Sequence, residues 1–340
     1  MNFRSDNEAP VNDTILQAIV EANQHCEESY GYDRYTLRLQ EKMKQLFSCW
    51  CEVIPLSTGT AANSLATALS TPPYGSLFCY EGSHMNVDEC GAPEFFSDGA
   101  KLIGIQGQQG KIDLDLLEQS LQATGSHGEH ECLPSSISIT QSTEAGTLYS
   151  LEELQRFNKI KQKYNLYLHM DGSRIANALA RLKCSIADMT WKTGIDLLSF
   201  GATKNGAMIA EALIIFNPKI AKEIKRRRKR AGHLISKMRF ISAQLLAYLK
   251  DDLWLHLASH ANKQADDFYQ ALKNSHEFVY PVQANEVFLR LPENLIEKLQ
   301  NQGFEFHVWT GSSDIIRLVF SHATQGSDVE QLIKAIRDEN

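Results

Sequence analysis

Two stretches of this sequence decide the fold: residues 168–174, which read Leu-His-Met-Asp-Gly-Ser-Arg, and residues 199–206, which read Ser-Phe-Gly-Ala-Thr-Lys-Asn-Gly. The first completes an apolar run, 166–170, that predicts a buried strand ending on Asp171. The second completes another such run, 195–200, which leads into a glycine-rich turn that carries Lys204. The sequence therefore predicts two strands that end on an acid and on an amine.

The residues between these strands favour a parallel arrangement. Residues 175–192 leave room for a helix and a return loop, as a β–α–β unit requires. The carboxyl ends of neighbouring parallel strands lie at one edge of the sheet, where open α/β sheets bind their ligands. We therefore expect Asp171 and Lys204 to face the same crevice.

An acid and an amine so placed suit pyridoxal 5'-phosphate (PLP). A carboxylate beside the pyridine nitrogen keeps the ring protonated, so that the ring accepts electrons from a carbanion. A lysine amine holds the cofactor as a Schiff base until an amino-acid substrate displaces it. Each residue also has an ordinary interpretation, in which Asp171 caps the next helix and Lys204 is a solvated loop lysine.

The motif around Asp171 also resembles that of a known enzyme family. His-Met-Asp-Gly-Ser-Arg resembles the His-Met-Asp-Gly-Ala-Arg of low-specificity threonine aldolases, and the lysine segment resembles that of their phenylserine-aldolase-like branch. Both belong to the β-eliminating lyase group of fold-type I PLP enzymes. The resemblance runs from Phe3 to about Val329, nearly the whole chain.

The resemblance implies an α/β fold with an aspartate aminotransferase-like large domain, a mainly parallel sheet and a small α+β C-terminal domain. We expect an N-terminal arm and helix over residues 1–25, a PLP-binding large domain over 26–238 and the small domain over 239–340. Strands are predicted in the small domain at 278–280, 286–291, 304–309 and 315–320. A polar loop is predicted at 125–131.

A phosphate site is predicted where the strand at 52–56 turns into a helix through Thr58, Gly59 and Thr60. Free N–H groups and the helix dipole favour an anion at a helix N-terminus, although hydroxyl residues cap ordinary helices too. The resemblance supports the anion site, because these three residues match the family's Ser-Gly-Thr. We also expect Thr203, next to the cofactor lysine, to contact the cofactor.

His84 follows the strand predicted at 76–80. A histidine there can stack on the cofactor ring and act as an acid or base, or it can be a plain surface or capping residue. The family places a histidine flat against the pyridine with a glutamate five residues on, which His84 and Glu89 match. His84, acting directly or through water, is thus the predicted base.

Three further residues are predicted to bind the substrate. Arg174, three residues past Asp171, could reach the ring oxygen or the substrate carboxylate bidentately, or lie on a helix surface. Arg317 lies in an apolar strand and could face solvent. The resemblance implies instead that Arg317 and Ser5 bind the substrate carboxylate.

The sequence departs from the family pattern at residues 141–146. These residues read Gln-Ser-Thr-Glu-Ala-Gly, where many threonine aldolases read Glu-Asn-Thr-His-Asn-Gly.

Composition excludes several other classes of function. The 340 residues are 43% hydrophobic and carry a formal charge of −7, which offers no field for nucleic acid or an anionic membrane. No apolar run approaches the roughly 20 residues of a membrane span, and the polar start of the chain predicts a cytoplasmic protein. The seven cysteines follow no metal-binding spacing, so no metal is expected. The basic run at 225–230 is interpreted as a solvated helix face, although the resemblance would bring Arg228 or Lys229 near a neighbouring subunit's phosphate.

The expected activity is PLP-dependent cleavage of L-threonine, allo-threonine or related β-hydroxy-α-amino acids to glycine and an aldehyde, by a homodimer or homotetramer with shared sites. The nearest alternative is a PLP-dependent β-eliminating lyase acting on an aromatic or sulfur amino acid. A racemase, an aminotransferase or a PLP-dependent regulator without turnover are further alternatives.

Overall fold

The computed structural model describes residues 1–124 and 127–338, so Gly125 and Ser126 of the predicted polar loop lie outside it. A seven-stranded sheet dominates, in the order β1-β7-β6-β5-β4-β2-β3. Its strands are β1 (Glu52–Leu56), β2 (Gly75–Tyr80), β3 (Lys101–Ile105), β4 (Leu133–Thr140), β5 (Tyr167–Gly172), β6 (Leu197–Gly201) and β7 (Glu211–Ile215). The run from β3 to β6 is parallel, and β7 is antiparallel to both of its neighbours. The predicted mainly parallel sheet is confirmed.

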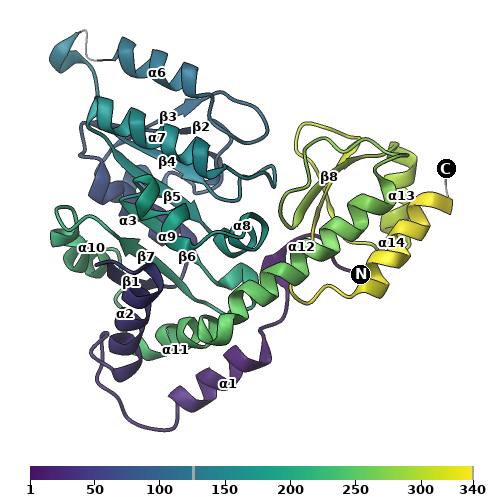
Figure 1. Cartoon of the computed structure of the whole chain (residues 1–340), viewed down its shortest axis with the longest axis horizontal. Coiled ribbons are helices and arrows are strands. Elements are labelled where there is room, and N and C mark those ends of the chain that lie inside the picture. Colours follow the sequence, from purple (N-terminus) through teal and green to yellow (C-terminus); the bar gives the residue numbers. More distant parts are fainter. Residues whose placement is uncertain (125–126, 339–340) are drawn as a thin grey trace.

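The two deciding strands lie side by side, as predicted. β5 pairs with β6 in parallel, with Asp171 opposite Ser199. Both strands are buried along nearly their whole length, because helices cover both faces of the sheet (Figure 1). Successive side chains of β6 enter different cores: Leu197 packs with α3, and Leu198 packs with the helices on the other face.

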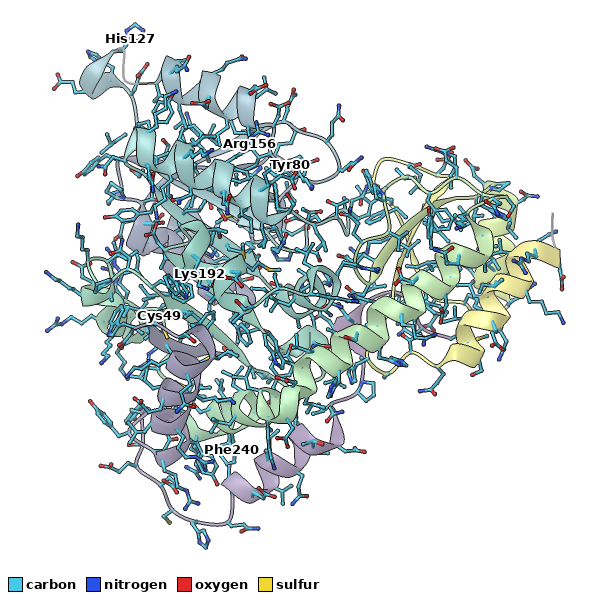
Figure 2. All side chains as sticks on the ribbon, in the orientation of Figure 1. Cys49, Tyr80, His127, Arg156, Lys192 and Phe240 are labelled. Atoms are coloured by element: carbon cyan, nitrogen blue, oxygen red, sulfur yellow. The ribbon has the colours of Figure 1, made fainter. Side chains whose placement is uncertain are left out.

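The helices of this larger body precede, join or follow its strands in chain order. They are α1 (Asp13–Ala22), α2 (Arg34–Phe47), α3 (Gly59–Ser70), α4 (His84–Val87), α5 (Ala92–Phe96), α6 (Leu114–Ala123), α7 (Leu151–Tyr164), α8 (Ile175–Leu182), α9 (Ile186–Met189), α10 (Ile224–Arg230) and α11 (Arg239–Tyr248). Side chains fill the space between these helices and the sheet (Figure 2). No helix in the described part of the chain has the length and apolar character of a membrane span.

A second body holds the antiparallel sheet β8-β10-β9, formed by β8 (Glu286–Arg290), β9 (His307–Val308) and β10 (Ile315–Val319). Its helices are α12 (Leu253–Leu272), α13 (Glu293–Asn301) and α14 (Gly326–Asp338). The N-terminal arm lies against it (Figure 1), because Phe3 bonds to the backbone of Glu305 and Val319 and enters its core.

Two of the strands predicted here are wrong in extent. The run at 278–280 makes only an isolated bridge, from Phe278 to Leu289, and the next residue, Pro281, has no N–H to extend a ladder. The run at 304–309 shortens to β9 because Glu305 pairs with Asn2 of the arm. The sequence reading also missed α13, whose start after Pro292 and apolar spacing are ordinary helix signals.

The two cores meet along α12. Trp254 and Ala258, in its first half, belong to the larger core, and Phe268 and Leu272, near its end, belong to the smaller. The helix α11 also packs in the larger core, through residues that include Leu245. The division of the chain at 25 and 238 remains a prediction.

Candidate active site

The predicted site residues gather at the carboxyl edge of the large sheet. A cavity of about 230 Å³ opens there, where β1, β5 and β6 end. It is lined by Asn7, Ser57, Thr58, Gly59, Thr60, Asn63, His84, Glu89, Asp171, Ser173, Thr203, Lys204 and Glu211. We call this the inner cavity. The crevice expected from the two strand ends is therefore present, with the acid and the amine both in its wall.

The N-terminus of α3 forms one wall of the inner cavity. Thr58 is its N-cap and accepts the Ala61 N–H at 3.1 Å. Gly59 and Thr60 form the first turn, whose N–H groups have no partner within the helix. The helix is 12 residues long, so its dipole favours an anion here. The wall thus suits a phosphate group, and the phosphate site stays a prediction.

Asp171 is buried and held by three donors. Its Oδ2 accepts the Asn63 amide at 2.9 Å, and its Oδ1 accepts the backbone N–H and the hydroxyl of Ser173 at 3.0 and 2.7 Å. Burial acts to raise the pKa of Asp171, but these hydrogen bonds and the charge of Lys204 outweigh it, so the pKa lies below its usual value. The carboxylate therefore stays ionised, as a partner for a protonated ring nitrogen must.

A chain of buried hydrogen bonds fixes the amide that holds Asp171. The Ser199 hydroxyl donates to Asn63 Oδ1 at 2.7 Å, and His169 lies between Ser199 and Ser138, with its Nε2 3.0 Å and its Nδ1 2.8 Å from their hydroxyl oxygens. Burial lowers the pKa of His169 to about 4, so the ring is neutral. A neutral ring satisfies this chain if Nε2–H donates to Ser199 and Nδ1 accepts from Ser138. The amide of Asn63 thereby presents its NH₂ group to the carboxylate.

Lys204 lies just after β6, and its amino group makes no hydrogen bond or ion pair with another described residue. The turn before it passes close to the Asp171 segment, because a Cβ on Gly201 would meet the Ser173 carbonyl oxygen at 2.6 Å. The backbone N–H of Thr203 donates to Glu211 at 3.2 Å. Burial raises the pKa of the Glu211 carboxyl to about 7.

His84 stands at the mouth of the inner cavity. Its Nδ1 lies 2.9 Å from Glu89 Oε1, and the same oxygen accepts the Asn63 amide at 2.8 Å. The hydrogen bond to Glu89 raises the pKa of the His84 imidazole. The expected pairing of His84 with Glu89 is therefore present.

A second, outer cavity of about 610 Å³ continues from the first. The two share Asn7, His84, Asp171, Ser173 and Lys204. The outer wall adds residues of the N-terminal arm, of β4 and of the small sheet, among them Ser5, Thr140, Ser142, Glu144, Arg174, Glu286, His307, Val308, Trp309 and Arg317.

Arg317 and Ser5 meet in the outer cavity, although more than three hundred residues separate them. One Nη of Arg317 donates to the Arg4 carbonyl at 3.3 Å, and its buried Nε has no partner among the described residues. Its guanidinium lies 5.9 Å from the centre of the Trp309 ring. The side chain thus faces the cavity and retains a free donor, as a carboxylate-binding arginine requires.

Arg174 also lines the outer cavity, but its guanidinium is already engaged. Its Nε and Nη2 donate to the two oxygens of Asp6 at 2.7 and 2.9 Å, and its Nη1 lies 3.2 Å from Glu286. The edge that would grip a carboxylate bidentately is therefore occupied by Asp6. In this geometry Arg174 fixes the arm that carries Ser5.

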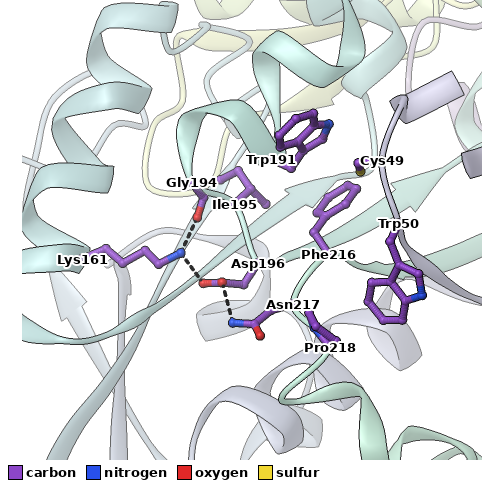
Figure 3. Close-up of a pocket in the computed structure, with 10 residues that line it drawn as sticks. All are labelled: Cys49, Trp50, Lys161, Trp191, Gly194, Ile195, Asp196, Phe216, Asn217 and Pro218. Carbon is purple, nitrogen blue, oxygen red and sulfur yellow. Dashed lines mark hydrogen bonds and ion pairs between the residues drawn. The ribbon is translucent and has the colours of Figure 1, made fainter.

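A hollow of about 620 Å³ lies at the opposite, amino edge of the same sheet and is about the same size as the outer cavity (Figure 3). Its charges are paired. Lys161 Nζ binds the Gly194 carbonyl at 2.6 Å and Asp196 at 2.7 Å, and Asp196 also accepts from Asn217 and from the backbone N–H of Leu168. We call this the amino-edge hollow.

Several residues of the site were not predicted. Asn63 lies one helical turn after Gly59 on α3, so its spacing could have placed it on the cavity face. Asp6 and Glu286 are brought in from distant parts of the chain, and no local pattern marks them or Glu211, which lies eight residues after Thr203. Arg228, expected on a solvated face, is buried, with its Nε unpartnered among the described residues.

The comparisons with known proteins identify the family of this chain. A family model described as beta-eliminating lyase matches residues 2–293. A low specificity L-threonine aldolase from Pseudomonas aeruginosa is 40% identical over 343 residues, which cover 98% of this chain and 96% of that protein.

Solved structures agree as well. A threonine aldolase from Leishmania major matches with a TM-score of 0.93 at 27% identity, over 99% of both chains. An aspartate aminotransferase from Thermotoga maritima matches with a TM-score of 0.74 at 14% identity, over 100% of this chain and 91% of its own, and supports the fold alone.

Proposed function

Because this chain belongs to the beta-eliminating lyase family, we propose that it is a PLP-dependent aldolase that cleaves L-threonine, allo-threonine or related β-hydroxy-α-amino acids to glycine and an aldehyde. The observation that carries the reaction type is its 40% identity, over nearly the full length of both chains, to a low specificity L-threonine aldolase. The fold, in turn, is that of fold-type I PLP enzymes.

The residues of the inner cavity fit PLP group by group. The N-terminus of α3 suits the phosphate, Asp171 suits the ring nitrogen, and the unpaired amine of Lys204 suits the aldehyde carbon. His84, which lines the same cavity, would contact the ring. When bound, PLP supplies an electron sink for the carbon whose bond is broken.

The residues of the outer cavity orient the substrate in this proposal. Arg317, with its free Nε, and Ser5 bind the α-carboxylate. A carboxylate fixed in this way decides which bond of the α-carbon stands perpendicular to the ring, and so which bond breaks. The remaining outer wall, with Val308 and Trp309, contacts the group on the β-carbon.

We also propose a cytoplasmic homodimer or homotetramer with shared sites. The seven cysteines are all unpaired thiols, in keeping with a reducing compartment. The buried guanidinium of Arg228, whose pKa is lowered by burial, is a group that a partner's anion would satisfy. Light scattering of the purified protein during size-exclusion chromatography tests the assembly, and a monomer would contradict it.

A substrate panel tests the proposed reaction. PLP-loaded protein is offered L-threonine, L-allo-threonine, L-phenylserine and L-tryptophan, with assays for glycine, aldehyde, ammonia and keto acid. Glycine and aldehyde in equal amounts from the hydroxy amino acids are expected. Ammonia and a keto acid instead would favour the β-eliminating lyase, which needs the same cofactor site.

A further inference from the structure

Glu144, in the outer cavity, has a carboxyl group with one oxygen that makes no hydrogen bond to another described residue. Glu144 follows β4, and its Oε1 accepts two hydrogen bonds, from the backbone N–H of His84 at 2.9 Å and from the Thr140 hydroxyl at 2.8 Å. Its Oε2 is buried and has no hydrogen-bond partner among the described residues. Two donors thus fix the direction of the carboxyl group while one oxygen stays free.

A free buried carboxyl oxygen is costly, so its presence in a cavity needs a cause. Asp171, in the same cavity wall, shows the ordinary solution, because donors engage both of its oxygens. Burial, with the charge of Asp171 added, raises the pKa of Glu144 to about 7. A group with that pKa gives up and takes up a proton readily near neutral pH, as a general base must.

His84, the base predicted from the sequence, is less well prepared. Its Nδ1 is committed to Glu89, and the same contact raises the pKa of the ring. A raised pKa acts against His84 as a base, because an imidazole can accept a proton only in its neutral form. Both residues line the outer cavity, but only Glu144 offers a free oxygen that ionises near neutral pH.

We propose that Glu144, and not His84, is the catalytic residue that removes the β-hydroxyl proton of the substrate, an inference that rests on the aldolase function proposed above. The substrate O–H bond breaks, and its proton passes to Oε2 of the Glu144 carboxylate. The O–H electron pair becomes the second bond of the aldehyde carbonyl. The Cα–Cβ bond breaks, and its electron pair stays with the α-carbon, which then takes up one proton to become glycine. Glu144 returns its proton to solvent, so the cycle neither gains nor loses one.

The test separates this role from support of the site. Glu144→Gln keeps the shape but cannot accept the proton. PLP-loaded variant and wild type are compared in two reactions: aldehyde release from L-threonine or L-phenylserine, and exchange of the glycine α-proton for deuterium, followed by NMR. Exchange breaks a bond at the same α-carbon but involves no β-hydroxyl group. The visible absorbance of the bound cofactor reports whether the site is intact.

Aldehyde release is expected to fall by about 10²- to 10⁴-fold, with glycine exchange within about threefold of wild type and the absorbance unchanged. Glu94→Gln is the matched control, because Glu94 also has a buried, unpartnered Oε2 but lies outside both cavities. That variant should release aldehyde at the wild-type rate.

Three outcomes would overturn the inference. Full aldehyde release by Glu144→Gln would show that another group takes the proton. Equal loss of aldehyde release and glycine exchange would reduce Glu144 to a structural role. Wild-type protein that exchanges glycine but releases no aldehyde from any β-hydroxy amino acid would refute the proposed function and, with it, this inference.

Discussion

The hollows at the two edges of the large sheet are similar in size, but they differ in whether their charged groups are paired. At the amino edge, Lys161 and Asp196 bind each other, and nearby carbonyl and N–H groups take up their remaining capacity. At the carboxyl edge, the Lys204 amine, the Arg317 Nε and the Glu144 Oε2 have no hydrogen-bond partner among the described residues. Cavity volume therefore does not identify the active site. The hollows differ instead in whether their charged groups are paired, and a cavity wall with several unpaired charged groups is what a ligand site requires.

The strongest test of this contrast replaces the lysine in each hollow. Lys204→Ala should lose turnover by a factor on the order of 10⁴ or more, and with it the visible absorbance of bound PLP, because Lys204 is the one lysine among the described residues that line the two cavities. The measurement is aldehyde release with a parallel absorbance spectrum. An active, coloured Lys204→Ala protein would break the comparison.

Asp171→Asn is expected to have the next largest effect. The amide keeps the size of the side chain but removes the charge that stabilises a protonated ring nitrogen, so kcat should fall by about 10²- to 10³-fold. PLP should still bind, since Lys204 and the α3 N-terminus remain. Retention of wild-type kcat would mean that Asp171 is only a buried hydrogen-bond acceptor.

Arg317→Met should act mainly on substrate binding. A hydrogen bond to a charged group contributes about 1.5–3 kcal/mol, so KM should rise by about 10- to 100-fold. The cofactor spectrum should not change, because Arg317 lines only the outer cavity. An unchanged KM would contradict the assignment of the substrate carboxylate to this arginine.

The pH dependence of kcat/KM tests the unpaired Glu144 carboxyl group, with a smaller expected effect than the substitutions above. Glu144 must be ionised to accept a proton, so kcat/KM should rise with pH through about 7 and fall by about fivefold from pH 7 to pH 6. The neighbouring titratable groups are His84, Asp171, Tyr80 and Tyr149. Asp171 is ionised throughout this range and both tyrosines have raised pKa values, so the groups that could imitate the profile are His84 and Glu211, whose pKa at the inner cavity is also about 7. A profile that persists in Glu144→Gln would assign it to another group, His84 or Glu211, and contradict the role of Glu144.

Lys161→Met, at the amino-edge hollow, should leave turnover unchanged. The substitution breaks a largely buried ion pair, in which the side chains of Lys161 and Asp196 are 18% and 8% exposed. The free energy of unfolding should fall by roughly 1–3 kcal/mol, less than for a fully buried pair because Asp196 keeps two other donors. Chemical denaturation and an aldehyde assay check this. A large loss of activity at wild-type stability would make this hollow functional too.

The sequence predicted the part of the site that local patterns determine. The strands before Asp171 and Lys204 are apolar runs that end in turns, and the helix after Thr58 begins with a capping residue, so each functional group sits at a readable boundary. The parallel pairing of β5 and β6 followed from the length of chain between them.

What the sequence did not predict depends on contacts between distant residues. The free oxygen of Glu144 is defined by a bond to His84, sixty residues away, and Asp6 reaches Arg174 across 168 residues. The shortening of β9 likewise follows from the arm that pairs with Glu305. Periodicity and turn signals describe one segment at a time, and so they cannot state which atoms of a cavity remain unpaired.

The most direct measurement locates the cofactor on the chain. PLP-loaded protein is reduced with borohydride, which makes the lysine linkage permanent, and is then digested and mapped by mass spectrometry. The adduct is expected on Lys204, at the edge where the charged groups are unpaired. An adduct on Lys161, in the amino-edge hollow, or no adduct on any lysine, would contradict the account.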